Sequence, residues 1–236
     1  MVRHSVLVLI ALAATAPDAR ANALATLEEE QTALFDRVAP AVVVIRSGDA
    51  RATGFAVAPG LVVTVAHALH DRDVTVTLYD GRVVRGEVVE RSPSGLDLAL
   101  VRIPATPARV LELRSATAVR TGSLVAVVGH GEGLFWSLAT GLVSNAEPVG
   151  PDAALLALQV ALRPGASGGP VVDRSARVVG VVSQGASGIA FAVRADAVLR
   201  AFPAIGAAAA APRDPAGPVA ARAAADAGEH ASDAAP

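Results

Sequence analysis

The chain has 236 residues, a formal net charge of −2 at neutral pH and no cysteine. That length allows one or two domains with a substantial buried core. The charge balance, without any basic run, gives no reason to expect nucleic-acid binding, and the lack of cysteine excludes disulfides, thiolate metal sites and a cysteine nucleophile. Hydrophobic residues make up 53% of the chain but aromatic residues only 3%, so valine, leucine, isoleucine and alanine must build the core. The many β-branched residues favour a β protein.

The N-terminus has the pattern of an export signal. A short basic start at residues 1–4 precedes a compact apolar run at residues 5–14. Small residues at 19 and 21, or alternatively at 21 and 23, supply a cleavage site. The run is shorter than the ~20 residues that a membrane span needs. We therefore expect a cleaved signal peptide at residues 1–21, not an anchor, and a periplasmic or secreted protein.

A short helix and a first set of strands should follow. Apolar residues at 27, 34 and 35 lie among acidic ones over residues 24–37, and Pro40 should end this helix. Turn signals such as Pro59-Gly60 and Asp80-Gly81 then separate several short β-type runs. These runs lie at residues 41–47, 53–58, 61–65, 74–78, 83–90 and 98–103.

After a looser stretch at residues 104–121, a second set of six β-type runs is predicted. They lie at residues 124–129, 136–144, 154–160, 171–173, 178–184 and 189–193. No long helices alternate with the strands, which argues against a parallel α/β sheet. The pattern predicts an all-β fold of two six-stranded antiparallel β-barrels, at about 41–104 and 122–193.

The C-terminal part changes composition. A short helix at residues 195–202 should close the ordered domain, which we place at residues 24–205. The remainder is mostly Ala, Pro, Gly, Asp and Arg, with hardly a large apolar side chain. Such a segment buries too little surface to offset its ordering entropy, so we expect a disordered tail at residues 206–236. We also expect truncation after Phe202 to leave stability unchanged.

The most specific motif is the segment 163–170, with the sequence RPGASGGP. A serine hydroxyl is an effective nucleophile when it lies beside a base and faces a pair of backbone donors. Glycines around Ser167 allow the main chain to bend so that the amides of Gly165 and Ser167 converge on one point, as an oxyanion hole requires. The alternative is an ordinary turn between two strands.

Two further residues gain meaning as a pair. His67 follows a valine-rich strand and alone would be a packed structural residue, while Asp97 alone would be a solvated residue at a strand start. Together, Asp97 can accept a hydrogen bond from the imidazole of His67 and stabilise the imidazolium. The order His, Asp, Ser along the chain is that of the chymotrypsin-like class, and it differs from the subtilisin and α/β-hydrolase orders.

From Leu34 to about Leu199 the chain resembles the protease domain of the HtrA/Deg family of bacterial envelope proteases. The similar segments are LFDRVAPAVV at 34–43, VTVTLYDGR at 74–82, ATGLVS at 139–144 and GIAFAV at 188–193. The resemblance implies a chymotrypsin-like double barrel and a serine endopeptidase with the triad His67, Asp97 and Ser167. It implies protein or peptide substrates, such as unfolded or envelope proteins, and no metal or other cofactor.

Two departures from that family limit what the resemblance implies. Ala166 stands where the family usually has an asparagine just before the nucleophile, and we expect modest consequences. Family members normally continue into one or two PDZ domains, whereas here the expected tail carries no PDZ domain. Peptide-triggered activation and cage assembly are therefore not implied, and the oligomeric state stays open.

The same resemblance places a substrate pocket beside Ala161, Ser183, Gln184 and Ala190. None of these residues is acidic, so a buried Lys or Arg of the substrate would lose its hydration without gaining a partner. We therefore expect a preference for small to medium aliphatic residues. For Ser183 two roles are open: support of Asp97, or pairing with the substrate backbone.

Two alternatives complete the interpretation. His70 follows His67 at helical spacing with two aspartates nearby, but no third ligand presents itself, so we expect no metal site. The other candidate function is a peptide-binding or chaperone-like envelope protein whose protease activity is slight or lost.

Overall fold

The computed structural model describes residues 17–92, 95–115, 119–149, 154–186 and 188–210. Residues 1–16 of the expected signal peptide and residues 211–236 of the expected tail lie outside these ranges. Within them, helix α1 (Pro17–Val38) leads through a 3-10 turn (Ala39–Ala41) into the strands, and α2 (Ala195–Ala201) and α3 (Pro203–Ala210) follow the last strand. No helix in the described ranges combines the length and the apolarity that crossing a membrane requires.

Six of the described strands close into a first antiparallel barrel, in the order β1-β2-β3-β6-β5-β4. Its interior is tightly filled by valine and isoleucine, as the composition requires. A Cβ on Gly54, for example, would lie 2.7 Å from Ile45 Cδ1 and 2.8 Å from Val62 Cγ1, so only glycine fits there. The strands are β1 (Val42–Ser47), β2 (Ala50–Ala58), β3 (Leu61–Thr64), β4 (Asp73–Thr77), β5 (Val83–Arg91) and β6 (Ala99–Arg102).

The other six described strands close into a second antiparallel barrel, in the order β10-β11-β12-β9-β8-β7. Its β11 carries a bulge, because the register with β12 shifts between Val182 and Gln184. The extra residue at the bulge is Ser183, which falls out of the regular ladder. The strands are β7 (Leu124–Gly129), β8 (Ser137–Val149), β9 (Leu155–Gln159), β10 (Pro170–Val172), β11 (Val178–Ala186) and β12 (Ile189–Arg194).

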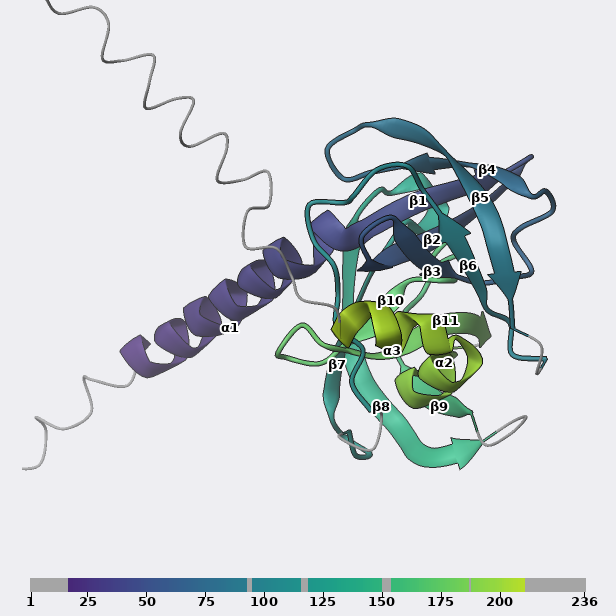
Figure 1. The fold of residues 1–236 in the computed structure, drawn as a ribbon. Coiled ribbons are helices and arrows are strands. Elements are labelled where there is room, and N and C mark those ends of the chain that lie inside the picture. The colour runs from purple at the N-terminus through teal and green to yellow at the C-terminus, as the bar shows by residue number, and fades with distance from the viewer. Residues whose placement is uncertain (1–16, 93–94, 116–118, 150–153, 187, 211–236) are drawn as a thin grey trace, which may run out of the picture.

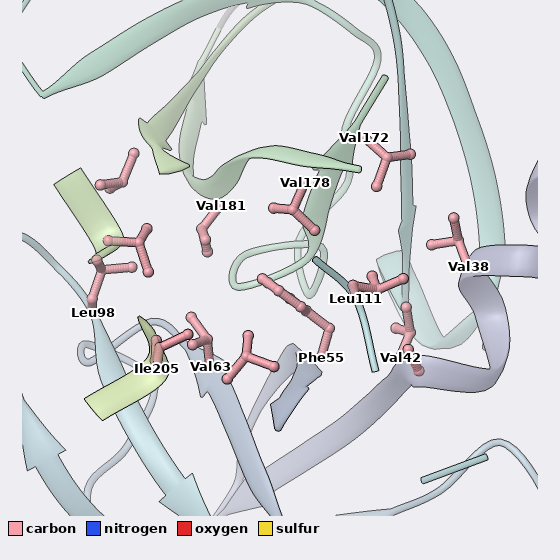
Figure 2. Packing of buried hydrophobic residues seen from close by; sticks show 14 of the residues in the cluster. Val38, Val42, Phe55, Val63, Leu98, Leu111, Val172, Val178, Val181 and Ile205 are labelled. Atoms are coloured by element: carbon pink, nitrogen blue, oxygen red, sulfur yellow. The ribbon is translucent and has the colours of Figure 1, made fainter. Parts of the chain in front are cut away.

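One hydrophobic core joins the two barrels. Phe55 of β2 is fully buried, and Figure 2 shows it among side chains of both barrels, with Val63 and Val178 near it. The connecting segment binds both sides as well, since the amide of Leu111 donates to Ala56 O at 2.9 Å and that of Arg114 to Val178 O at 2.7 Å. The seam between the barrels is therefore a packed interior.

The predicted double barrel is confirmed, and all twelve predicted strands are present in the described ranges. The largest differences are that β2 begins at Ala50 and β8 continues to Val149. Strand prediction succeeded because β-branched runs and turn residues mark both the strands and their ends.

The helices differ more from expectation. The N-terminal helix is not short: α1 has 22 residues and begins at Pro17, inside the expected signal peptide. Figure 1 shows it projecting away from the barrels, and its outer Leu24 and Leu27 are exposed. Because this part of the helix is exposed, it lacks the apolar stripe from which its first residue could have been predicted.

The C-terminal expectation also needs correction. Helix α3 runs through Ala210, five residues into the segment predicted to be a disordered tail. Ile205 is only 1% exposed and packs in the core between the barrels (Figure 2). The premise that no apolar side chain docks after Phe202 was therefore wrong, and truncation there should destabilise the protein.

Candidate active site

The turn that carries Ser167 joins β9 to β10 in the second barrel. Arg163 O accepts a hydrogen bond from the amide of Ala166 at 3.0 Å, across Pro164 and Gly165. Gly165 has a φ of +100°, which the third residue of a type II turn requires, and proline is favoured at the second residue. The sequence thus builds a tight turn directly before Ser167.

All carbonyls of this turn are held by the protein. Because the C=O and N–H of a trans peptide point in opposite directions, a held carbonyl also orients the next residue's amide. The amides of Gly165 and Ser167 point away from the bonded carbonyls and have no hydrogen-bond partner in the described part of the chain. The five hydrogen bonds are Ala166 N to Arg163 O (3.0 Å), Glu132 N to Pro164 O (2.8 Å), Thr53 Oγ1 to Gly165 O (2.7 Å), Gly169 N to Ala166 O (3.0 Å) and Thr53 N to Ser167 O (2.9 Å).

Glu132, which holds one of these carbonyls, lies in a strained loop after β7. Its φ is +51°, in the left-handed region that residues other than glycine rarely adopt. Its carboxylate pairs with Arg163, so the loop meets the turn through both backbone and side chain. Arg163 therefore points to Glu132, as part of a surface ion pair.

His67 and Asp97 are in direct contact in the first barrel. Asp97 Oδ2 is hydrogen-bonded to His67 Nδ1. Asp97 Oδ1 accepts from the amides of Ala66 at 3.1 Å and His67 at 2.8 Å. One carboxylate thus fixes both the ring and the backbone of the histidine. With Nδ1 donating to Asp97, Nε2 is the nitrogen left to accept a proton.

The opposite side of the His67 loop is held by Arg91, at the end of β5. Its Nη1 donates to Ala66 O at 3.0 Å and its Nη2 to Leu69 O at 2.9 Å. The sequence analysis missed Arg91 because its partners are backbone carbonyls, which leave no motif in the sequence. The loop is therefore fixed by a carboxylate on its amides and a guanidinium on its carbonyls.

The structure places Ser167 and His67 on opposite barrels without a hydrogen bond between them. Within the described ranges, neither Ser167 Oγ nor His67 Nε2 has a hydrogen-bond partner. Such bonds are often long before a substrate is bound and tighten in the complex. The His67 side chain is 54% exposed and that of Asp97 29%, so the pair is open to solvent.

The predicted pocket residues divide into two kinds. Ala161 and Gln184 are exposed, whereas Ser183 and Ala190 are buried. Ser183 makes no hydrogen bond with Asp97 in the described residues, so the suggested support of Asp97 is not found. Its place at the bulge leaves its backbone outside the regular ladder, and pairing with a substrate backbone stays a prediction.

His130, directly after β7, is buried. Its Nδ1 accepts a hydrogen bond from the amide of Trp136 at 3.1 Å, and its ring meets Trp136 edge to face. Burial lowers the pKa of His130 to about 4, against a smaller opposing effect of the Val43 backbone. The ring is therefore neutral at pH 7 and packs as an aromatic residue.

The described residues contain no cluster of three or more His, Cys, Asp or Glu arranged for a metal ion. His70 is exposed at the surface, and its amide donates to Ser47 Oγ at 2.9 Å.

Comparisons with known proteins identify the family of the chain. Residues 52–181 match the family model described as trypsin-like peptidase domain. A probable periplasmic serine endoprotease, DegP-like, from Halomonas elongata is 29% identical over 150 residues, which is 59% of this chain and 31% of that protein. A DegP-like relative from Brucella suis is 32% identical over 157 residues, 61% of this chain and 30% of that protein. The mitochondrial serine protease HTRA2 of Bos taurus is 33% identical over 185 residues, 69% of this chain and 40% of that protein.

The chain spans about a third of the length of the DegP-like relatives it matches. Among solved structures, the inactive form of the Rv3671c protease has a TM-score of 0.64 and 28% identity, covering 73% of this chain and 92% of that chain. The family model covers more than half of this chain. The chain belongs to the trypsin-like peptidase domain family, and within it the chain is similar to HtrA and DegP-like serine proteases.

Proposed function

We propose that the protein is a serine endopeptidase that hydrolyses peptide bonds through an acyl-enzyme intermediate. Ser167 is the nucleophile, His67 the general base and acid, and Asp97 the residue that orients His67. The amides of Gly165 and Ser167 form the oxyanion hole. The turn at Ser167 carries the proposal. All its carbonyls are bonded, while the amides of Gly165 and Ser167 have no partner among the described residues. The His67–Asp97 pair lies in the neighbouring barrel.

The chemistry follows from these groups. Ser167 Oγ attacks the scissile carbonyl carbon while His67 Nε2 takes its proton, and the two amides donate to the oxygen that becomes negative. His67 then gives the proton to the leaving amine as the C–N bond breaks. Water attacks the acyl ester, and His67 again takes and returns a proton. Asp97 keeps Nδ1 protonated, so that Nε2 is free for each transfer.

The substrate class follows from the family and from the predicted pocket. Protein or peptide substrates fit the endoprotease names of the relatives, and the word periplasmic in those names supports an envelope location. The uncharged residues at 161, 183, 184 and 190 favour small to medium aliphatic side chains before the cleaved bond. An extra methylene is worth only about 1–3 kcal/mol in such a pocket, so selectivity among aliphatics should be loose.

A second candidate is a peptide-binding protein without catalysis. It is favoured by the lack of a hydrogen bond between Ser167 and His67 in the described residues. A fluorophosphonate probe separates the two candidates, because it reacts only with an activated serine. Covalent labelling at Ser167 supports the protease, whereas peptide binding without labelling supports the alternative.

The decisive variant is Ser167→Ala. It removes one hydroxyl that makes no hydrogen bond in the described structure, so the fold and the thermal midpoint should stay nearly unchanged. We expect labelling and peptide cleavage to be abolished. Cleavage by the variant at the wild-type rate would refute the assignment of the nucleophile. A peptide-library profile then tests the pocket, and cleavage confined to sites after Lys or Arg would contradict it.

A further inference from the structure

We propose that Thr53 of the first barrel is a positioning residue for the oxyanion hole of the second barrel. Its hydroxyl holds the turn before Ser167 in the conformation that leaves the amides of Gly165 and Ser167 free. This inference rests on the proposed function, since it concerns the geometry of the same site.

Thr53 uses all its polar atoms, and most of its hydrogen bonds lead to the second barrel. The residue lies on β2 and is fully buried. Its amide donates to Ser167 O at 2.9 Å and its hydroxyl to Gly165 O at 2.7 Å. The hydroxyl also accepts from the amide of His130 at 3.1 Å. A single buried side chain thus bonds the turn to His130, the residue after β7.

The turn needs this support because it has little steric support of its own. Gly165 has no side chain, its φ is +100°, and glycine can leave such a conformation easily. A Cβ at that position would lie 2.5 Å from His130 O, so a bulkier residue cannot replace the hydrogen bonds. Without the hydroxyl of Thr53, the Gly165 carbonyl loses its partner. The Gly165–Ala166 peptide links the two peptides that carry the amides of Gly165 and Ser167. Once its carbonyl is free, this peptide can rotate and move those two amides out of line.

Thr53 also contacts β3, the strand that precedes His67. Thr64 Oγ1 donates to Thr53 O at 2.7 Å, and His67 follows Thr64 by three residues. Contact at this point is close, since a Cβ on Gly168 would lie 2.0 Å from Thr53 O. Thr53 therefore ties the nucleophile turn to the side of the first barrel that carries His67 and Asp97.

The test compares Thr53→Val, which replaces the hydroxyl with a methyl group of similar size, with Thr53→Ser, which keeps the hydroxyl. Rates are expressed per active site, titrated with the fluorophosphonate probe. Loss of one oxyanion donor costs about 10²–10³ in kcat, so misplacing one should cost about 10–100-fold. We expect that loss in Thr53→Val with KM changed less than about twofold, and near wild-type kcat in Thr53→Ser. Thr75→Val, the same change on β4, should keep wild-type activity.

A transition-state readout separates positioning from mere stability. A peptide boronic acid forms a tetrahedral adduct with Ser167 and should bind Thr53→Val more weakly by the same factor that kcat/KM falls. The corresponding product peptide should bind equally to both proteins. If Thr53→Val does not fold, Thr53→Cys replaces it. The thiol is a weaker donor of similar size to Ser, so Thr53→Cys should be at least 10-fold slower than Thr53→Ser.

The outcomes are distinct. Wild-type kcat per titrated site in Thr53→Val, or equal losses in the Ser and Val variants, would overturn the role of the hydroxyl. If the folded wild-type protein neither labels nor cleaves, or if Ser167→Ala still cleaves, the proposed function fails before any Thr53 variant is compared.

Discussion

The two halves of the candidate active site are assembled in different ways. In the first barrel, the Asp97 carboxylate binds the ring and the backbone amide of His67 directly, and Arg91 of the same barrel holds the loop carbonyls. In the second barrel, no charged side chain of the described residues bonds the backbone of the turn at Ser167. Its carbonyls are bonded by neighbouring amides and by Thr53 of the other barrel. The acid–base half is locally complete, whereas the nucleophile half depends on docking.

The largest expected effect comes from breaking the acid–base half. Asp97→Asn keeps the shape but favours the wrong imidazole tautomer, and it should lower kcat by about 10⁴-fold, the cost of the equivalent change in a trypsin-class enzyme. Steady-state kinetics on a peptide substrate measure this. Asp73→Asn, at the exposed start of β4, is the control and should keep wild-type activity. Full activity in Asp97→Asn would remove Asp97 from the mechanism.

The second prediction concerns the nucleophile half, where burial of His130 should make the free energy of unfolding depend on pH. His130, whose amide binds Thr53 Oγ1, has its pKa lowered by burial to about 4 from an ordinary value of 6.5. The unfolded chain therefore binds the proton more readily, and stability falls as the pH drops from about 6.5 towards 4. The free energy of unfolding should decrease by on the order of 2 kcal/mol between pH 7.5 and 5 from this group. Denaturant titration of wild-type and His130→Gln proteins isolates the contribution, and identical pH dependence in both would contradict it.

The smallest expected effect on kcat is that of Arg91→Met, which tests whether Asp97 alone can hold the His67 loop. Arg91→Met removes the two bonds to the loop carbonyls but leaves those of Asp97. Hydrogen bonds to charged groups are worth about 1.5–3 kcal/mol, and most of that should appear in stability, so kcat should fall by about 10-fold or less. Kinetics and a thermal melt of the same sample measure both quantities. A loss in kcat as large as that of Asp97→Asn would mean that Asp97 cannot hold the loop alone.

The fold was predictable from the sequence to a large extent. Apolar runs, most of them rich in β-branched residues, marked the strands of the described barrels, because local pattern decides them. The helix ends were less predictable. Pro17 is a suitable first residue of a helix, but it lies in residues 1–21, which the pattern predicted to be a signal peptide. Ile205 stands alone in an alanine-rich segment, and only its docking shows that it belongs to the core.

The site was predictable only where its residues carry motifs. The motifs indicated Ser167, His67 and Asp97, and the structure brings the last two into contact. Thr53 and Arg91 could not be identified, because they act on backbone carbonyls that no side-chain pattern reveals. The hydrogen bond from Thr53 to Gly165 joins residues 112 positions apart, and its existence depends on how two barrels dock.

The hydrogen bonds of Thr53 between the two barrels also determine at which stage of folding the proposed active site is complete. His67 and Asp97 both belong to the first barrel, so their contact involves no residue of the second. The turn at Ser167 receives its last hydrogen bonds only after the second barrel has closed and docked. Under the proposed function, competence for cleavage therefore requires both barrels, and a chain whose second barrel has not docked lacks the held turn at Ser167.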